Sequence, residues 1–384
     1  MHALYLLLTS FVTAAAASEV SCAEKAPKVC QGLRRDFGNS KLLPEDEAYT
    51  EEVQESGLKR IVDHKVEFAM RGGGHMPISN ASSIGATGIL VSSKNTRTLQ
   101  LSDDRDTLTI GPGLRWSDVY TALDGTGVTV LGGRGSPTGV SGLLLGGGVS
   151  IFSYEYGLAS TNGNIKAYEV CETPRTPNSD LKQLTEKNQC VLADGSIAQV
   201  TSTNEHADLF WALQVGGNSF CLVTRFHLQT RRTPSVMIAS PSPLFCPSSP
   251  TSAFKETRGG IIGFAFNPII SAFLAATNAR PGALQGIDES PACWIEQTYS
   301  WADEADDEIF NTFISEFNAR VRERLEPMGA LYPFYYLNEA NVGQPVFKSY
   351  PEGNLDRLKE IRNKYDPARV LTDLTPGGFK VATA

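Results

Sequence analysis

The sequence has no excess of positive charge and no long apolar run beyond its N-terminus. Its 42 acidic and 34 basic residues give a formal net charge of −8. Nucleic acids and anionic membranes are bound by concentrated basic surfaces, so neither is expected as the main partner. No internal stretch approaches the roughly 20 apolar residues that a transmembrane helix requires.

Metal-binding motifs and the common nucleotide-binding motifs are also absent. No two of the seven cysteines have CxxC spacing and the five histidines are scattered, so no metal site is expected. The sequence contains neither a Walker A segment nor a GxGxxG segment between a strand and a helix. An NAD-type Rossmann domain is therefore not expected.

Glycine, by contrast, is abundant. The chain has 35 glycines, and they cluster between Gly72 and Gly148, each cluster at the end of a short strand or the head of a helix. Without a Cβ atom, backbone N–H groups can reach the oxygens of a pyrophosphate, and positive φ angles become available for tight turns. A single cluster is equally typical of an ordinary turn, so spacing alone leaves both interpretations open.

The N-terminus is typical of a secretory signal peptide over residues 1–17. An apolar run at 3–8 precedes a small-residue stretch at 14–18, and together they predict a secreted protein. No Lys or Arg precedes the run, so a buried N-terminal helix is the alternative. All cysteines follow the expected cleavage site, where Cys22 and Cys30 are close enough to bridge. Asn80 begins the only glycosylation sequon, which predicts a glycoprotein.

The hydrophobic pattern predicts a mixed α+β chain, long enough for two domains. Strands are expected at 66–70, 107–110, 128–131 and 222–226. Helices are expected at 51–63, 117–125, 204–216, 303–325 and 355–365. Ser117 and Asn204 are the predicted N-caps of two of these helices. Residues 241–251, rich in Pro and Ser, are expected to form a linker.

Several motifs resemble those of a known family in their residues and in their order along the chain. These motifs are RGGGHMPI from Arg71, LGGRG from Leu131, LGGGVS from Leu145, YGL from Tyr156, LADG from Leu192, DLFWAL from Asp208 and GGNSF from Gly216. In this order they resemble the FAD-linked oxidoreductases of the vanillyl-alcohol-oxidase superfamily, in the berberine-bridge-enzyme-like branch. The resemblance covers residues 60–232 and returns at 336–340 and 364–367.

This resemblance implies a fold and a reaction. A PCMH-type FAD-binding domain with two subdomains is expected at 40–232, a shortened antiparallel-sheet substrate domain at 233–330, and a C-terminal return to the FAD domain at 331–384. The implied protein is a monomeric FAD-dependent oxidase. It takes a hydride from a small organic substrate, such as a secondary metabolite, and passes the electrons to O₂, while the protein supplies position and electrostatics.

The resemblance also implies roles for particular residues. His75 matches the histidine that bonds the flavin covalently, whereas Gly135 stands where bicovalent relatives have a cysteine, so a second link is not expected. The implied cofactor-binding set is Arg71, Gly72, Gly73, Gly74, His75, Gly142, Gly146, Gly147, Gly148, Val223, Tyr336 and Asn338. The catalytic base is not identified, and its candidates are Tyr154, Tyr336 and Glu339.

Two departures from the family pattern bear on activity. A strand that normally precedes the helix at Glu51 is missing, and a polar insert separates Val170 from Val191. If the strands flanking the insert pair as neighbours, Cys171 and Cys190 lie within bridging distance. The missing strand keeps two further interpretations open: a non-catalytic remnant of a flavoprotein, and a binding protein for a small ligand.

Overall fold

The fold is given by a computed structural model that describes residues 61–85, 88–169, 190–191, 197–233 and 261–384. The expected signal peptide, Cys22, Cys30, Cys171, the linker at 241–251 and most of the helix at 51–63 lie outside these residues. Among the residues described, Cys293 is an exposed free thiol.

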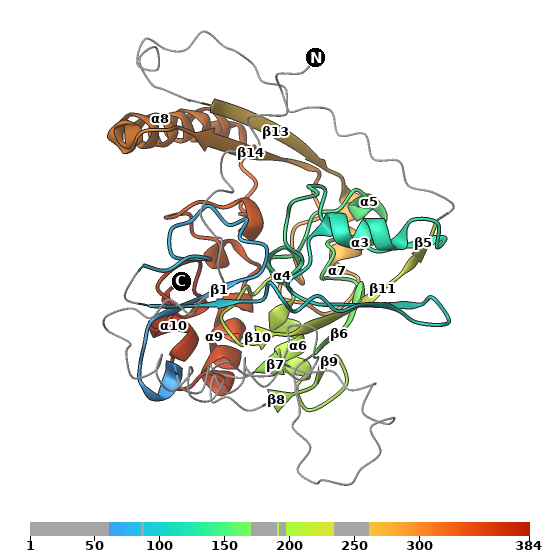
Figure 1. Ribbon diagram of the computed structural model, residues 1–384. Helices are drawn as coiled ribbons and strands as arrows, with labels where there is room; N and C mark the ends of the chain where they lie inside the picture. The colour runs from blue at the N-terminus through green and yellow to red at the C-terminus, as the bar shows by residue number, and fades with distance from the viewer. Residues whose placement is uncertain (1–60, 86–87, 170–189, 192–196, 234–260) are drawn as a thin grey trace, which may run out of the picture.

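The central sheet has five antiparallel strands in the order β3-β4-β11-β6-β9. They are β3 (Leu99–Leu101), β4 (Thr107–Ile110), β11 (Arg225–Gln229), β6 (Ile165–Glu169) and β9 (Val200–Thr201). On β11 the buried residues Phe226 and Leu228 alternate with half-buried ones, the pattern of a strand with one face on the core. Figure 1 shows this sheet running across the middle of the molecule.

Three smaller sheets complete the strands of this part of the fold. β1 (Phe68–Arg71) and β2 (Ile89–Ser92) form a parallel pair. A three-stranded sheet has the order β10-β7-β8, with β10 (Leu222–Val223), β7 (Cys190–Val191) and β8 (Ile197–Ala198). β12 (Arg231–Arg232) pairs with β5 (Val128–Thr129).

Two strand predictions are wrong, one about the extent of a strand and one about strand pairing. The single strand expected at 222–226 is divided at Thr224, so that β10 and β11 join different sheets. The strands on either side of the 170–189 insert are not neighbours either, because β6 pairs with β11 and β9, while β7 pairs with β10 and β8. The pairing that suggested a Cys171–Cys190 bridge is therefore absent, although Cys171 itself is not described.

Four short helices pack against these sheets: α3 (Trp116–Leu123), α4 (Val140–Leu145), α5 (Ser153–Tyr156) and α6 (Ala207–Leu213). Their apolar residues contribute to one continuous core with the strands. On α6 the predicted apolar face is confirmed, because Leu209, Phe210 and Leu213 are all buried.

The two predicted N-caps are wrong by a few residues. The helix expected from Ser117 begins one residue earlier, with Arg115 as its N-cap, because the Asp118 carboxylate accepts the backbone N–H of Arg115 at 2.8 Å. Likewise, α6 has His206 as its N-cap. Asn204 lies in the preceding turn, where its Oδ1 accepts the backbone N–H of His206 at 3.1 Å.

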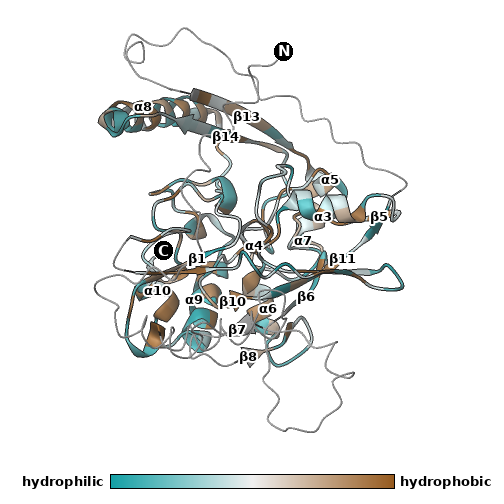
Figure 2. Ribbon diagram, viewed as in Figure 1, coloured by the Kyte–Doolittle hydropathy of each residue, from teal (hydrophilic) through white to brown (hydrophobic). Residues whose placement is uncertain are grey.

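The region after residue 260 begins with a two-stranded antiparallel ribbon, β13 (Ile261–Ile269) and β14 (Ala292–Ser300), with α7 (Ser271–Asn278) between them. The predicted long helix is confirmed as α8 (Asp307–Leu325), preceded by η3 (Glu304–Asp306) and followed by η4 (Glu326–Met328). Figure 1 shows α8 lying along the ribbon at one end of the molecule. Hydrophobic and hydrophilic residues alternate around this helix (Figure 2).

An aromatic layer joins α8 to the ribbon. The ring centroids of Phe264 and Phe317 are 5.4 Å apart, and those of Tyr299 and Phe313 are 6.1 Å apart. This leaves the opposite face of the ribbon turned toward the rest of the protein. An isolated two-stranded ribbon is marginally stable in water, so the contacts with α8 help to give it a defined shape.

The chain then returns to the first part of the fold through η5 (Leu337–Glu339), η6 (Phe347–Ser349), α9 (Asn354–Tyr365), α10 (Val370–Asp373) and η7 (Val381–Thr383). The predicted helix ending at Tyr365 is confirmed. Lys364 and Tyr365 both contact the carboxylate of Asp208 on α6, at 2.6 and 2.7 Å. The α+β class with small antiparallel sheets is thus confirmed, and the expected domain boundaries stay predictions.

Candidate functional site

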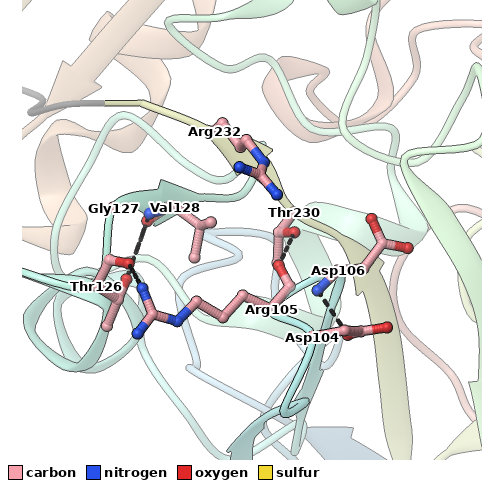
Figure 3. A pocket seen from close by; sticks show the side chains of 8 residues that line it. All are labelled: Asp104, Arg105, Asp106, Thr126, Gly127, Val128, Thr230 and Arg232. Carbon is pink, nitrogen blue, oxygen red and sulfur yellow. Dashed lines mark hydrogen bonds between the residues drawn. The ribbon is translucent and has the colours of Figure 1, made fainter.

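A polar cavity of about 260 Å³ lies at the turn between β3 and β4, and no residue of the glycine clusters lines it. Its walls come from that turn and from β5 and β12: Asp104, Arg105, Asp106, Thr126, Gly127, Val128, Thr230 and Arg232 (Figure 3). Its polar groups bond to each other. Arg105 donates to the carbonyl of Thr126 at 2.8 Å, and the Thr230 hydroxyl donates to the carbonyl of Arg105 at 2.6 Å. These lining groups therefore bond to one another, and the cavity is accounted for by the structure of the turn.

The first glycine cluster forms the loop that follows β1. Arg71 is the last residue of the strand, and its Cδ atom lies 3.2 Å from where a Cβ on Gly74 would stand. Gly74 has a φ of 67°, a conformation that glycine adopts without strain. His75 follows and is exposed. The loop therefore presents accessible backbone, one guanidinium group and one imidazole.

This loop rests directly on the segment that leads into α4. A Cβ on Gly73 would stand 2.3 Å from the Cα of Gly139, and one on Gly72 would stand 2.1 Å from the Ser141 hydroxyl. The two chain segments can approach this closely only because both positions are glycine. Gly142, one turn into α4, is exposed and has no atom within 4 Å of its own Cβ position. Here the backbone faces open space.

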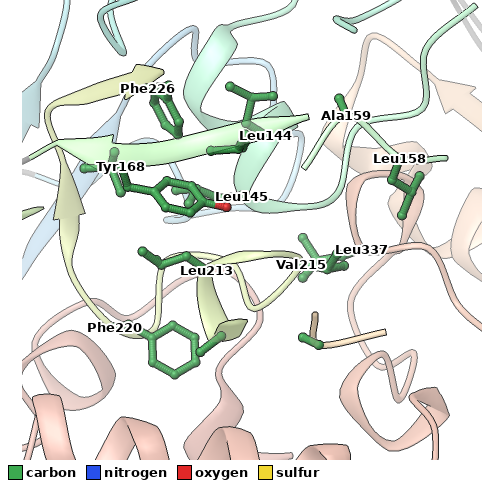
Figure 4. Packing of buried hydrophobic residues seen from close by; sticks show 14 of the residues in the cluster. Leu144, Leu145, Leu158, Ala159, Tyr168, Leu213, Val215, Phe220, Phe226 and Leu337 are labelled. Carbon is green, nitrogen blue, oxygen red and sulfur yellow. The ribbon is translucent and has the colours of Figure 1, made fainter. Parts of the chain in front are cut away.

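The third cluster, Gly146–Gly148, is approached by protein side chains. A Cβ on Gly146 would collide with the Asn338 amide, at 1.9 Å from its Oδ1. Gly147 has a φ of 107°, and its Cβ position lies 3.1 to 3.5 Å from Leu158, Tyr336 and Val215. Leu158 and Val215 belong to the same buried cluster as Leu337 (Figure 4). Packing and backbone conformation thus account for these glycines without reference to a ligand.

Tyr336 and Asn338 attach the C-terminal return to this cluster. The Tyr336 hydroxyl oxygen accepts the backbone N–H of Val149 at 2.8 Å and the Asn338 amide N–H at 3.0 Å. Asn338 also donates to the carbonyl of Leu143 at 2.9 Å. Burial raises the pKa of Tyr336, and the negative charge of Glu339 adds to that increase. Tyr336 and Asn338 therefore lie on the third glycine cluster, and their predicted contact with the flavin ring stays a prediction.

A polar cluster joins three parts of the chain next to Tyr336. Arg134, from the second glycine cluster, contacts Glu339 of η5 at 3.0 Å and donates to the Oδ1 of Asn267 on β13. Burial, with a smaller contribution from the charge of Glu296 on β14, raises the pKa of Glu339 to about 7, although the charge of Arg134 acts in the opposite direction. Glu339 therefore exchanges protons near neutral pH, the range suited to a general base.

Trp294 provides the apolar wall beside this cluster. It lies on β14 directly opposite Asn267 in the strand register, and it is 8% exposed. Its ring stacks on Tyr336 with centroids 5.5 Å apart and contacts Phe334 at 5.0 Å. The inner face of the ribbon thus meets the C-terminal return at Tyr336.

The sequence-predicted residues fall into two groups. The first glycine loop with His75, the start of α4, and the third cluster with Tyr336, Asn338 and Glu339 are linked by the contacts described above. Tyr154 is on α5 with 49% of its surface exposed, and Val223 is buried on β10, paired with Cys190. Neither has a contact in the structure that ties it to the polar cluster.

Sequence reasoning missed Arg134, Asn267, Trp294 and Glu296. The only available signal was the Arg within the second glycine cluster, LGGRG. The other three are on the ribbon, where the family resemblance is weak. The contacts of Arg134 join residues 133 and 205 positions apart, and such pairs are not visible in the local pattern.

Within the described residues there is no group of His, Cys, Asp and Glu side chains that could hold a metal ion. No helix there is long and apolar enough to cross a membrane.

Comparison with known proteins identifies the cofactor. Residues 48–172 match the family model of the FAD binding domain. An FAD-dependent monooxygenase, prx3 of Penicillium roqueforti, is 25% identical over 94% of this chain and 95% of its own. That alignment extends over 509 residues, more than the 384 of this chain. The relative therefore has segments without a counterpart here.

Solved structures share the fold at low sequence identity. Glucooligosaccharide oxidase from Acremonium strictum, which carries a 6-S-cysteinyl, 8α-N1-histidyl FAD, is 18% identical with a TM-score of 0.59, over 86% of this chain and 89% of that chain. The berberine-bridge-enzyme-like protein 1 of Physcomitrella patens is 17% identical with a TM-score of 0.59, over 84% and 88%. The chain accordingly contains a match to the FAD binding domain and shares the PCMH-type fold of these FAD-linked oxidases.

The residues present fit an FAD. The glycine backbone at 72–74, half-buried at Gly72 and Gly73 and exposed at Gly74, follows Arg71, an anion-binding combination. Gly142 is exposed, with no protein atom within 4 Å of its Cβ position. Arg71, Gly72–Gly74 and Gly142 would hold the cofactor, with His75 within the same loop.

Proposed function

We propose that this protein is a secreted FAD-dependent oxidase of small organic molecules that carries its flavin covalently on His75. The observation that supports this most directly is the position of His75. It is exposed at the end of a glycine loop that rests on the Gly139–Gly142 segment. FAD would supply the two-electron redox chemistry, taking a hydride from the substrate and returning the electrons to O₂ as H₂O₂.

The protein's own contribution is to orient the substrate and accept a proton. We assign the proton to the Glu339 carboxylate, because its pKa of about 7 lies near the working pH and Arg134 holds one of its oxygens at 3.0 Å. Tyr336 is less suited as a base, since burial raises its pKa and its oxygen already accepts two hydrogen bonds. Its role is to hold the third glycine cluster against the ribbon.

The remaining parts of the proposal follow from the sequence. The signal peptide at 1–17 directs the chain out of the cell. Asn80, which is exposed, is the expected glycosylation site, and the protein acts as a monomer. Small organic metabolites are the proposed substrate class.

The covalent link is tested by His75→Ala. Purified wild-type protein should be yellow and should keep its flavin through acid precipitation, because the bond to imidazole is covalent. The variant should lose flavin or release it into acid, since Gly135 provides no thiol for a second link. Acid-stable flavin in the variant would contradict the assignment to His75. Colourless wild-type protein would instead favour the small-ligand binding protein or the non-catalytic remnant.

The proton acceptor is tested by pH–rate profiles once a substrate has been found by anaerobic flavin reduction. In the wild type, kcat/KM should rise with pH through the Glu339 pKa of about 7. Glu339→Gln should remove that rise and lower kcat by about 10²–10⁴-fold, whereas Tyr336→Phe should keep it. If Tyr336→Phe loses the titration and Glu339→Gln retains it, Tyr336 is the base.

The Penicillium relative makes monooxygenation the second candidate, because that protein is described as a monooxygenase. A monooxygenase transfers one oxygen atom of O₂ to the substrate, reduces the other to water, and needs two electrons from an added reductant. The oxidase needs no such reductant and forms one H₂O₂ for each substrate oxidised. Isotopically labelled O₂ separates them, since only monooxygenation places the label in the product.

A further inference from the structure

Two buried N–H donors on the inner face of the ribbon have no hydrogen-bond partner among the residues that the structure describes. They are the Asn267 Nδ2 and the Trp294 Nε1. Asn267 is 7% exposed and Trp294 is 8% exposed. Because a buried donor without an acceptor loses its bonds to water and gains none in return, such groups are rare and need an explanation.

The orientation of the Asn267 amide is fixed by chemistry. Arg134 donates a hydrogen bond to Oδ1 of this amide. A guanidinium group can only donate, so the oxygen of Asn267 must face Arg134 and the NH₂ group must point elsewhere. Arg134 is itself held by Glu339. The end of the Asn267 amide that faces away from Arg134 is therefore its NH₂ group, which is a hydrogen-bond donor.

The Trp294 indole stands beside this amide and is held there by packing. Asn267 and Trp294 are directly opposite in the antiparallel register of β13 and β14, which places their Cβ atoms about 4.5–5.5 Å apart on one face of the ribbon. Stacking on Tyr336 and contact with Phe334 hold the ring. Two donors on neighbouring side chains thus lie next to Glu339 and Tyr336.

We propose that Asn267 and Trp294 form a donor pair that binds the carbonyl oxygen of the substrate, so that this enzyme acts on carbonyl compounds. This inference rests on the proposed function, because it assigns a ligand to the same site. A carbonyl oxygen has two lone pairs and can accept from both donors. The positive charge of Arg134, transmitted through the Asn267 amide, strengthens the bond to an oxygen that carries partial negative charge.

Three variants of the full-length flavoprotein test the pair. Trp294→Phe removes one donor and keeps an aromatic ring. Asn267→Asp keeps an oxygen facing Arg134 but replaces the donor with a second oxygen, which repels a carbonyl. Gln297→Glu is the matched control, because Gln297 is on the other face of β14, where its amide donates to Asn318 of α8 at 2.9 Å.

The probes are 1-indanone and indane, which share a bicyclic skeleton and differ in one carbonyl group. Binding is followed by the indole N–H resonances of ¹⁵N-tryptophan-labelled protein, with the Trp294 signal assigned by its absence in Trp294→Phe. Indanone should move that resonance downfield and indane should not. The affinity for indanone should fall about tenfold or more in Asn267→Asp and in Trp294→Phe, and stay unchanged in Gln297→Glu.

Equal shifts with both probes, no shift with either, or unchanged indanone affinity in Asn267→Asp would overturn the donor pair. This readout does not depend on turnover, so it separates the pair from the proposed function. A protein that holds acid-stable flavin and oxidises a substrate, yet shows no indanone-specific shift, retains the proposed function and refutes the donor pair alone.

Discussion

Gly142 and Gly147 are glycines for different physical reasons, and substitution by alanine distinguishes them. Gly147 has a φ of 107° and close protein neighbours, so Gly147→Ala should strain the backbone and lower the thermal midpoint by an amount equivalent to about 1–3 kcal/mol. Gly142 lies in α4 with open space at its Cβ position. Gly142→Ala should leave stability equal or raise it by about 0.5–1 kcal/mol.

The flavin content of the same two variants locates the cofactor. If FAD lies against Gly142, the alanine variant should fold normally and bind less flavin. Full flavin loading in Gly142→Ala would show that this face does not contact the cofactor. Loss of flavin in Gly147→Ala without loss of stability would contradict the packing explanation given for the third cluster.

Lys380 gives a pH-dependent contribution to stability. It is 9% exposed, donates to the Thr375 hydroxyl at 2.5 Å, and burial lowers its pKa from 10.5 to about 8. Below pH 8 both the folded and unfolded chains carry the ammonium charge, so the cost of burying it is fully present. Between pH 8 and 10.5 the unfolded chain binds more protons, and stability therefore rises with pH.

Lys380→Met should remove this dependence. At pH 7 the variant should be more stable by about 1–3 kcal/mol, because no charge is buried, and the gain should shrink toward pH 10. Urea unfolding at several pH values measures it. A constant difference between variant and wild type across this range would show that Lys380 does not titrate as described.

At the scale of elements, the ribbon depends on the aromatic layer that joins it to α8. Phe317→Ala removes a ring that contacts both Phe264 and Phe313, at a cost of about 1–3 kcal/mol for a half-buried aromatic residue. The ribbon should then exchange its amide protons faster, and KM should rise, while the flavin spectrum stays unchanged. Ile309→Ala, at an exposed position on the same helix, is the control and should change neither.

The elements themselves were predictable where a single local pattern dominates. The strand Thr107–Ile110 and the helix α8 were found because a period of two or of 3.6 residues decides them. Ser117 was predicted as the N-cap of α3, but the N-cap is Arg115, whose backbone N–H donates to the Asp118 carboxylate. The backbone N–H of Ser117 donates instead to the carbonyl of Ser136. Local propensity cannot distinguish these alternatives.

Sheet partners and the polar cluster were not predictable in the same way. The segment from Leu222 to Phe226, rich in β-branched and aromatic residues, resembles a single strand, and only the tertiary fold divides it between two sheets. The site was recognised from motif order at the glycine loops and at Tyr336. The part of the site on the ribbon was missed, because Asn267 and Trp294 are separated in sequence and become neighbours only through the register of β13 and β14.

At the scale of the whole molecule, the end of the chain supports its first described strand. The buried carboxylate of Asp366 accepts the backbone N–H groups of Val370 and Leu371 at 2.7 and 2.9 Å, which fixes the start of α10 against the end of α9. The carbonyl of Leu374, just after α10, accepts the backbone N–H of Phe68 on β1 at 2.7 Å. The strand that leads into the glycine loop is thus held from the C-terminal side.

Asp366→Ala should therefore loosen a segment about 300 residues away in sequence. Removing the carboxylate leaves two buried N–H groups without acceptors, at a cost of about 1–3 kcal/mol each. Hydrogen exchange should accelerate at Phe68 as well as in α10, and flavin should dissociate more readily from a His75→Ala background. Asp373→Ala is the control, because it breaks only the exposed pair with Arg369, and such pairs contribute little. If exchange accelerates in α10 while Phe68 stays protected in Asp366→Ala, β1 is held independently of the C-terminal return.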